Sequence, residues 1–209
     1  MIAAGGSPTP PGLVFHSRLI FDGTAYIDTN LLIPEDGSIR AQLGYETTKG
    51  TQVLFNAEGR SYAYLNTSTN TTQRCFSASY DSSSVLVSGT NLTLAWTYNT
   101  YTFFLTPKRA GVGSNSRTFT KGTSRPTTGL VVGQNAAHTS TPYTGVIRES
   151  IRIYGSDAQN CAVYSDFDSY TPVYTLRVCT YNGENGLWCV ETSTFYGNSA
   201  GAGTLLVAD

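Results

Sequence analysis

Short runs in which apolar and polar residues alternate recur along the chain from Leu13, and each run ends at a turn signal. Side chains that alternate in this way lie on opposite faces of a β-strand. The first two runs flank Asp22-Gly23, and the next are separated by Asp36-Gly37, Lys49-Gly50 and Glu58-Gly59. Strands repeated about every 8–12 residues with such turns are typical of an antiparallel sandwich or barrel. The sequence therefore predicts an all-β fold, a two-sheet antiparallel β-sandwich.

The composition favours strands over helices. The 209 residues include 14 Tyr and 9 Phe, and only 13% of them are charged. Aromatic and β-branched residues suit pleated strands, whereas a scarcity of Ala, Glu and Lys disfavours helices. We expect one helical turn at most, within residues 155–168. A chain of this length is typical of one domain, so we predict a flexible Gly- and Pro-rich arm over residues 1–12 and one β-sandwich domain over residues 13–209.

The charge balance argues against several partners. The chain has 13 basic and 14 acidic residues, with no run of either sign. A nucleic-acid binder needs a basic face to neutralise phosphates, and a balanced chain has no attraction for an anionic membrane surface. No apolar stretch approaches the ~20 residues that span a bilayer. We therefore predict no nucleic-acid partner and no membrane partner.

The cysteines do not suggest a metal site or a disulfide scaffold. Cys75, Cys161, Cys179 and Cys189 lack CxxC spacing, and the chain has two histidines, so a zinc cluster is not expected. Cys179 and Cys189 flank a predicted hairpin, and a bridge across it is one alternative. We favour free thiols, because the N-terminus has no secretory signal and synthesis in a reducing compartment is expected.

Three stretches carry a family resemblance. They are GTAYIDTNLLIP (23–34), LVVGQNAAHTSTPYTGVIRESIRIYG (130–155) and NGENGLWCVETSTFYGNSAGAGTL (182–205). In this order they resemble landmarks of laminin-G-like, concanavalin A-like jelly-roll domains. The resemblance is to the subgroup of these domains that is found in bacteriophage virion proteins and gut-bacterial surface proteins. Trp188-Cys189 depart from the Tyr-Asp that the subgroup prefers. Asn182-Gly183 stand where the subgroup prefers Asp-Gly, and this pair favours the same kind of turn.

The resemblance implies a concanavalin A-like jelly roll in which early and late strands lie side by side. Residues 204–209 are then expected to form a last strand beside residues 18–21 or 25–28. Truncation at that end should unravel the sheet, whereas loss of residues 1–12 should leave the domain folded.

Carboxylates with the spacing of a glycosidase are missing. Glycoside hydrolases of this fold carry Glu-x-Asp-x-(x)-Glu on one strand face, and hydrolysis needs two carboxyls across the scissile bond. Asp166 and Asp168 are predicted to be turn or rim residues. Glu149 lies in a predicted strand whose Arg148 and Arg152 point to the opposite face, so no local partner is expected for it.

A catalytic triad is not predicted either. A Ser or Cys nucleophile needs a base, and His16 and His138 are both predicted to be hydrogen-bonding surface residues. We therefore predict no catalytic residues and no enzyme activity. No cofactor and no metal are predicted, because Asp22, Asp28, Asp36 and Asp81 form no linear binding loop. Calcium stays open as an alternative, since some laminin-G-like domains bind it at the sheet rim.

A glycan-binding surface is the remaining candidate site. Residues 108–128 form a polar stretch rich in basic residues, for which we favour a solvated loop with a short strand at 117–120 over a binding rim. Sugars stack on aromatic rings and exchange hydrogen bonds with Asn and Arg, whereas most aromatics, such as Trp96, pack in cores. The predicted glycan-binding residues are Tyr143, in an exposed loop, with Arg109, Asn115 and Arg117.

The resemblance implies a non-enzymatic bacteriophage structural protein: a capsid decoration, head-fibre or tail component whose lectin-like jelly roll contacts cell-surface glycans. It would be assembled into the virion in the host cytoplasm, as a homo-oligomer or a repeated part of an assembly. Residues 1–12 would contact other virion proteins, for example by adding a strand. The alternative is a stand-alone lectin or carbohydrate-binding module of a bacterial surface protein. A glycoside hydrolase ranks third.

Overall fold

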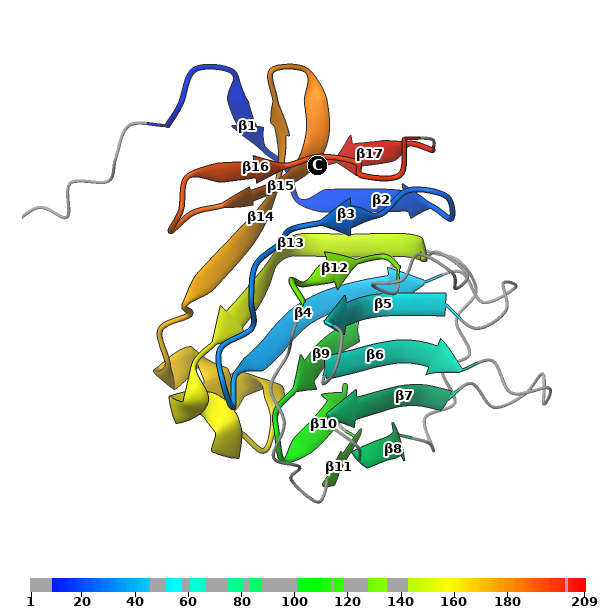
Figure 1. Ribbon diagram of the computed structural model, residues 1–209, viewed down its shortest axis with the longest axis vertical. Helices are drawn as coiled ribbons and strands as arrows, with labels where there is room; N and C mark the ends of the chain where they lie inside the picture. The colour runs from blue at the N-terminus through cyan, green and yellow to red at the C-terminus, as the bar shows by residue number, and fades with distance from the viewer. Residues whose placement is uncertain are drawn as a thin grey trace, which may run out of the picture.

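A computed structural model of the chain describes residues 9–45, 52–57, 61–66, 75–80, 83–87, 101–113, 115–118, 128–134, 143–201 and 203–209. These residues form two antiparallel sheets stacked as layers, together with two short 3₁₀ helices (Figure 1). The predicted all-β, two-sheet sandwich is confirmed. His138, Trp96 and Asp81 lie outside the described residues.

The larger sheet contains β1 (Leu13–Phe15), β2 (Arg18–Asp22), β4 (Ser38–Tyr45), β9 (Tyr101–Leu105), β10 (Arg109–Val112), β11 (Asn115–Thr118), β13 (Thr144–Tyr154), β14 (Tyr174–Tyr181), β15 (Glu184–Cys189), β16 (Thr194–Tyr196) and β17 (Leu205–Ala208). The smaller sheet contains β3 (Ile27–Asp28), β5 (Gln52–Ala57), β6 (Ser61–Asn66), β7 (Cys75–Tyr80), β8 (Ser83–Val87) and β12 (Val131–Val132). The main path of the larger sheet is β11-β10-β9-β4-β13-β14-β15-β16, and the smaller sheet runs β3-β12-β5-β6-β7-β8.

The principal core lies between the two sheets, as the alternating pattern predicts. In β9, Phe103 and Leu105 belong to this core, whereas Phe104 between them faces the other way. Phe55 of the smaller sheet stacks on Phe103 with the ring centroids 5.9 Å apart. The period-two alternation thus gives β9 one side-chain face toward the main core and another toward the outer face of the larger sheet.

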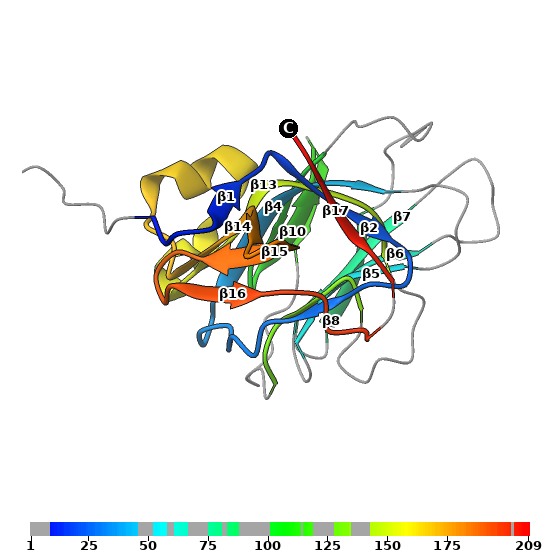
Figure 2. The same ribbon diagram turned by 90° about the horizontal axis from the view of Figure 1, so that it is seen from above.

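Two 3₁₀ helices cover part of the outer face of the larger sheet, on the side away from the smaller sheet (Figure 2). They are η1 (Ser156–Asn160) and η2 (Tyr164–Ser169). The prediction of one helical turn at most is therefore wrong. An Asp166 carboxylate oxygen accepts hydrogen bonds from the backbone N–H groups of Ala162 and Val163, which holds the start of η2. Phe167 is fully buried on the outer face of the sheet.

The C-terminal strand confirms one of the two predicted pairings. β17 lies beside β2, with Leu205 opposite Phe21 and Ala208 opposite Arg18 (Figure 1). Just before β17, Gly203 has φ +85°, and a Cβ there would lie 2.1 Å from the Thr24 hydroxyl oxygen. A glycine is thus required at this close approach.

Three cysteines are free thiols, which confirms the favoured alternative for Cys179 and Cys189. Cys161, Cys179 and Cys189 are buried and unpaired. In the β14–β15 hairpin Cys179 lies opposite Gly186, and Cys189 lies opposite Leu176. Cys179 packs in a small outer cluster and Cys189 in the main core, so the two side chains are on opposite faces of the sheet and no bridge can join them.

Candidate binding groove

The long strand β13 changes its partner near its middle. Residues Thr144–Arg148 pair with β2, and Ser150–Ile153 pair with β14. At the change, the register with β4 shifts between Arg148 and Ile151, which marks a β-bulge. Bulges re-aim side chains and are common beside functional sites.

The bulge directs Glu149 outward. Glu149 has φ +57°, an uncommon value for a residue with a side chain, and its N–H donates to the Ser17 carbonyl oxygen at 2.7 Å. Its carboxylate is exposed, 3.8 Å from the Nε atom of Arg148. The prediction that Glu149 lacks a local partner and opposes Arg148 is therefore wrong, because strict alternation stops at the bulge.

Two hollows in the outer face of the larger sheet meet at this bulge, and we call them together the bulge groove. Glu149, Ser150 and Arg152 line both hollows. The first, of about 190 Å³, is also lined by Arg40, Gln42, Arg148, Tyr164 and Asp168. The second, of about 510 Å³, is also lined by Phe15, His16, Ser17, Thr175 and Arg177.

Arg40 forms the inner wall of the first hollow. Its side chain, 4% exposed, extends from β4, and its guanidinium donates to a carboxylate oxygen of Asp168 at 2.7 Å. The guanidinium carbon lies 5.0 Å from the ring centre of Tyr164, 5.6 Å from that of Tyr154 and 6.0 Å from that of Phe167. The Nε atom is buried without a hydrogen-bond partner. The rings and Asp168 thus hold a buried cation whose polar contacts are incomplete.

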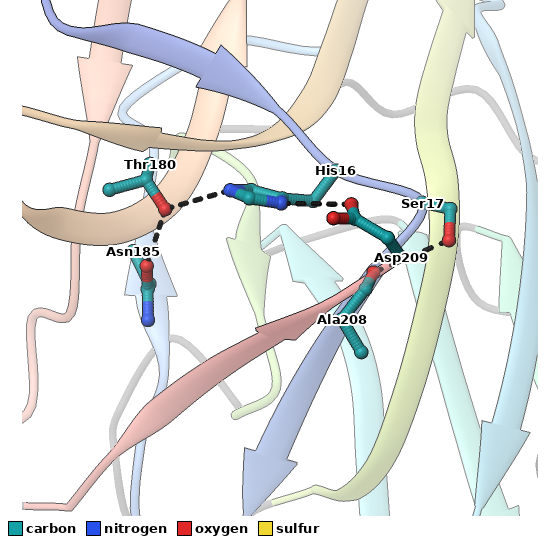
Figure 3. Close-up of polar contacts among 6 residues, drawn as sticks. All are labelled: His16, Ser17, Thr180, Asn185, Ala208 and Asp209. Carbon is teal, nitrogen blue, oxygen red and sulfur yellow. Dashed lines mark hydrogen bonds and ion pairs between the residues drawn. The ribbon is translucent and has the colours of Figure 1, made fainter.

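The second hollow is bordered by the turn between β1 and β2. Arg177 stacks over the ring of Phe15, with its guanidinium carbon 3.8 Å from the ring centre. His16 Nε2 lies 3.0 Å from the Thr180 hydroxyl oxygen, and Nδ1 lies 3.0 Å from a carboxylate oxygen of Asp209 (Figure 3). The hydrogen-bonding role predicted for His16 is confirmed. The imidazole is already held on both sides, so it acts as a wall of the hollow.

A short chain of hydrogen bonds connects this side of the hollow to the C-terminal strand. The Thr180 hydroxyl donates to the Asn185 side-chain oxygen at 2.7 Å, and the Asn185 amide donates to the Leu205 carbonyl oxygen at 2.9 Å. The Ser17 hydroxyl donates to the Ala208 carbonyl oxygen at 3.3 Å (Figure 3). The border of the groove is therefore tied to β14, β15 and β17.

Tyr143 is not a surface residue, and the prediction of an exposed ring is wrong. The side chain is fully buried and its ring packs against Phe21, with the centroids 5.4 Å apart. Its hydroxyl donates to the carbonyl oxygens of Gly44 and Val146. A Cβ at Gly145 would lie 2.6 Å from this ring. The neighbouring glycine makes room for the tyrosine to turn inward, where a sugar cannot reach it.

Arg109 and Arg117 are not among the residues that line the bulge groove, and the Asn115 side chain lies outside the described part of the chain. All three residues were predicted to bind a glycan. They lie in the hairpin of β10 and β11, where the sequence favours a loop with a strand at 117–120; the strand found is Asn115–Thr118. Arg109 is opposite Thr118 and Arg117 is opposite Ala110, so the pleat directs the two arginines to opposite faces. The Arg109 guanidinium donates to the Ser116 hydroxyl at 3.2 Å. Glycan binding by these three residues stays a prediction.

The groove residues were missed by sequence reasoning, although a signal for them exists. Arg40 and Gln42 alternate with Ile39, Ala41 and Leu43 in one strand, and Arg148, Arg152 and Arg177 occupy similar positions in two others. Each pattern identifies an outward position. Their convergence depends on β4, β13 and β14 being neighbours, which no local pattern specifies.

The described residues show neither a metal-binding cluster nor a membrane-spanning helix. They contain no group of three or more His, Cys, Asp or Glu side chains that could hold a metal ion. Within the same ranges, no helix has both the length and the apolar character needed to cross a bilayer.

Comparisons with known proteins identify the fold. No family model and no curated sequence matches the chain. Its structure is similar to that of a candidate carbohydrate-binding protein from Bacteroides ovatus, with a TM-score of 0.61 and 10% identity over 94% of this chain. The chain spans 61% of the length of that protein. A heptameric SAP-like pentraxin from Limulus polyphemus has a TM-score of 0.49 and 11% identity, over 66% of this chain and 76% of that one.

The class of fold follows from the structural similarity to the Bacteroides ovatus protein together with the sheet topology. The chain is a concanavalin A-like jelly roll. Identity near 10% establishes the fold alone, so the function is argued from the groove.

Proposed function

We propose that this chain is a carbohydrate-binding, lectin-like protein that holds a glycan in the bulge groove. The groove combines guanidinium, amide and hydroxyl groups with the ring of Tyr164 in two adjoining hollows that share three lining residues. Sugars offer hydroxyls to such polar groups and CH faces to aromatic rings. The carbohydrate-binding description of the Bacteroides protein supports the same assignment. The observation that carries the proposal is the meeting of the two hollows at the bulge.

The groove is suited to binding because its walls are already ordered. Arg40, Arg152 and Arg177 extend from adjacent strands of one sheet. Arg40 is held by Asp168 and by the surrounding rings, and Arg177 is held by Phe15. Side chains that are fixed before binding lose little conformational entropy when a ligand arrives.

The groove is not arranged for glycoside hydrolysis, and we propose that the protein is not an enzyme. Hydrolysis needs a carboxylic acid and a carboxylate on either side of the scissile bond. Among the residues that the structure describes, the carboxylates that line the groove are those of Glu149 and Asp168. Asp168 is bonded to the Arg40 guanidinium, and Glu149 is 64% exposed beside Arg148. Neither lies in the apolar setting that keeps a catalytic acid protonated.

The proposal is tested by filling the groove. Ser150 lines both hollows, so Ser150→Tyr should obstruct ligand entry. Calorimetry with the whole chain, on glycans selected from an array, should show binding that weakens at least about tenfold in this variant. Leu32→Tyr is the matched control, because Leu32 is 57% exposed and lies outside the groove. Failure of every glycan to bind, or equal binding by Ser150→Tyr, would contradict the assignment.

A release assay separates binding from hydrolysis. Prolonged incubation with each bound oligosaccharide should release no reducing sugar beyond the buffer control. Release that disappears in Glu149→Gln would identify an enzyme and overturn the non-enzymatic assignment.

We propose further that this jelly roll belongs to a bacteriophage structural protein and is present in the virion as a decoration, fibre or tail component. The three sequence landmarks between Gly23 and Leu205 support this role. We propose that residues 1–12, which precede β1, contact a neighbouring virion protein in a repeated assembly. Mass spectrometry of purified particles should detect the chain in multiple copies. Its absence from particles, with glycan binding retained, would favour the stand-alone lectin.

A further inference from the structure

We propose that the glycan held by the bulge groove is acidic, carrying carboxylate or sulfate groups on its sugar rings. This inference rests on the proposed carbohydrate-binding function and specifies the class of ligand. It follows from the charges that converge on the groove, which the near-neutral composition of the whole chain conceals.

The groove has a local excess of positive charge. Four arginines line it, Arg40, Arg148, Arg152 and Arg177, against the two carboxylates of Glu149 and Asp168. The complete chain has 13 basic and 14 acidic residues. The excess is therefore a local product of the sheet topology. A hollow in which one sign of charge predominates concentrates ligands of the other sign.

The two carboxylates lie closest to arginines of the first hollow, although Glu149 lines both hollows. Asp168 contacts Arg40, and Glu149 lies 3.8 Å from Arg148. Both of these arginines belong to the first hollow. Arg152, shared by the two hollows, and Arg177, in the second, form no ion pair with another described residue. These two arginines outnumber Glu149, the one carboxylate among the described residues that line the larger space. An anionic group of the ligand is expected to lie between these two residues.

The neighbouring strands set the spacing of the two cations. Arg152 is opposite Thr175 across the β13–β14 ladder, and Arg177 is two residues further along β14, opposite Ser150. Residues two apart on one strand face the same side. Thr175 and Ser150, which also line the second hollow, add hydroxyls beside the guanidinium groups. A guanidinium binds a carboxylate or sulfate through two parallel N–H donors, and hydroxyls bind the neighbouring sugar oxygens.

The aromatic residue of the second hollow strengthens this assignment. The guanidinium carbon of Arg177 lies over the ring of Phe15, 3.8 Å from the ring centre. Stacking on a ring leaves the edge of the planar guanidinium, which carries its N–H donors, free to face a ligand. The stacking also restricts the side chain before binding, so less entropy is lost when an anion is bound.

Direct binding measurements with defined oligosaccharides test the inference. Trigalacturonic acid carries carboxylates, a sulfated chondroitin disaccharide carries sulfate and carboxylate, and maltotriose is neutral. We expect the whole chain to bind at least one acidic probe about tenfold or more tightly than maltotriose, with binding that weakens as salt is raised. The difference between the two acidic probes distinguishes a carboxylate ligand from a sulfated one.

Charge variants locate the binding. Arg177→Gln and Arg152→Gln should each weaken acidic-probe binding about tenfold, and Arg152→Lys should recover only part of the loss because it keeps the charge but not the planar donors. Lys108→Gln removes the same charge from an exposed residue outside the groove, and it should bind as the parent does. Unfolding midpoints of all variants distinguish a lost contact from a lost fold.

Every other outcome overturns the inference. Equal binding of maltotriose and the acidic probes, with both weakened by Ser150→Tyr, would refute an acidic ligand while retaining glycan binding. Acidic-probe binding that is insensitive to both arginine variants would place the ligand elsewhere. Binding of no glycan of any kind would refute the proposed function together with the inference.

Discussion

The Nδ1 atom of His16 lies 3.0 Å from a carboxylate oxygen of Asp209, although 193 positions separate the two residues in the chain. This contact joins the turn between β1 and β2 to the end of β17, which pairs with β2 along its length. On its other side the same imidazole contacts Thr180 of β14. One side chain thus links the first strands, the last strand and the border of the bulge groove.

The last strand should contribute measurably to stability through Leu205. This side chain is 5% exposed and belongs to the main core, whereas its neighbour Leu206 is 51% exposed. Leu205→Ala should therefore lower the free energy of unfolding by about 2–3 kcal/mol. Leu206→Ala, the matched control in the same strand, should cost about 0.5 kcal/mol or less. Urea denaturation measures both, and equal losses would argue against the assigned register of β17.

Asp22 should make the fold sensitive to acid. Burial acts to raise the pKa of its carboxyl group, but hydrogen bonds from the Thr24 side chain, the Thr24 N–H and the N–H groups of Thr204 and Ala25 outweigh it and lower the pKa. A lowered pKa in the folded state means that the stabilisation is complete above about pH 4 and is lost as the pH falls through the folded-state pKa.

The variant Asp22→Asn tests this linkage. At pH 7 it should lower the free energy of unfolding by about 1 kcal/mol, a modest value because the carboxylate is largely exposed. The difference from the parent chain should shrink when the pH falls below about 4. Urea titrations at several pH values measure the difference, and a gap that does not change with pH would contradict the assigned role of the charge.

Asp168 should stabilise the fold through Arg40. Removing the charge with Asp168→Asn leaves a buried guanidinium without its anionic partner, and we expect a loss of about 1–2 kcal/mol. Loss of a fully buried partner would cost more, but Asp168 is 69% exposed. In an Arg40→Met background the same substitution should have little effect, because no buried cation remains. A double-mutant cycle from urea denaturation measures the coupling, and strictly additive losses would contradict it.

The buried thiols should resist modification in the folded protein. Burial raises the pKa of Cys161 to about 11 and that of Cys179 to about 12, so almost no thiolate is present at pH 8. In a Cys75→Ser background, a disulfide reagent should react slowly with the native chain and rapidly in urea. Rapid labelling of these two residues without denaturant, located by mass spectrometry, would contradict their burial.

The same pKa shifts predict that alkali weakens the fold. A thiol whose pKa is raised by folding contributes stability that is present below its ordinary value near 9 and is lost as the pH rises toward the folded-state value. The free energy of unfolding should therefore fall above pH 9, by less in a Cys179→Ala variant than in the parent chain. Unfolding midpoints measured from pH 7 to about pH 10.5 provide the test.

Local patterns predicted the strands well and the bulge poorly. The alternation in residues 145–155 indicated β13 correctly, because hydrophobic periodicity depends only on which face is buried. The same alternation placed Glu149 opposite Arg148. The partner of β13 changes at this point from β2 to β14, and the resulting bulge depends on residues far away in the chain.

Tyr143 shows a second limit of sequence reasoning. A tyrosine among Thr, Pro and Gly is typical of an exposed loop, yet this ring lies against Phe21 and its hydroxyl bonds to the backbone of β4 and β13. The burial depends on space left by Gly145 and on partners supplied by other strands. A local pattern contains neither.

The sequence by itself determined the class of fold and several local features. Alternation and turn residues specified a two-sheet β-sandwich, and the family landmarks placed the last strand beside an early one. These features follow from side-chain periodicity and backbone preferences, which act over a few residues. Only the tertiary structure decided where arginines from β4, β13 and β14 converge and how Glu149 joins them. Strand order and register bring together positions more than 100 residues apart, and the pairing energy that selects them is summed over the whole sheet.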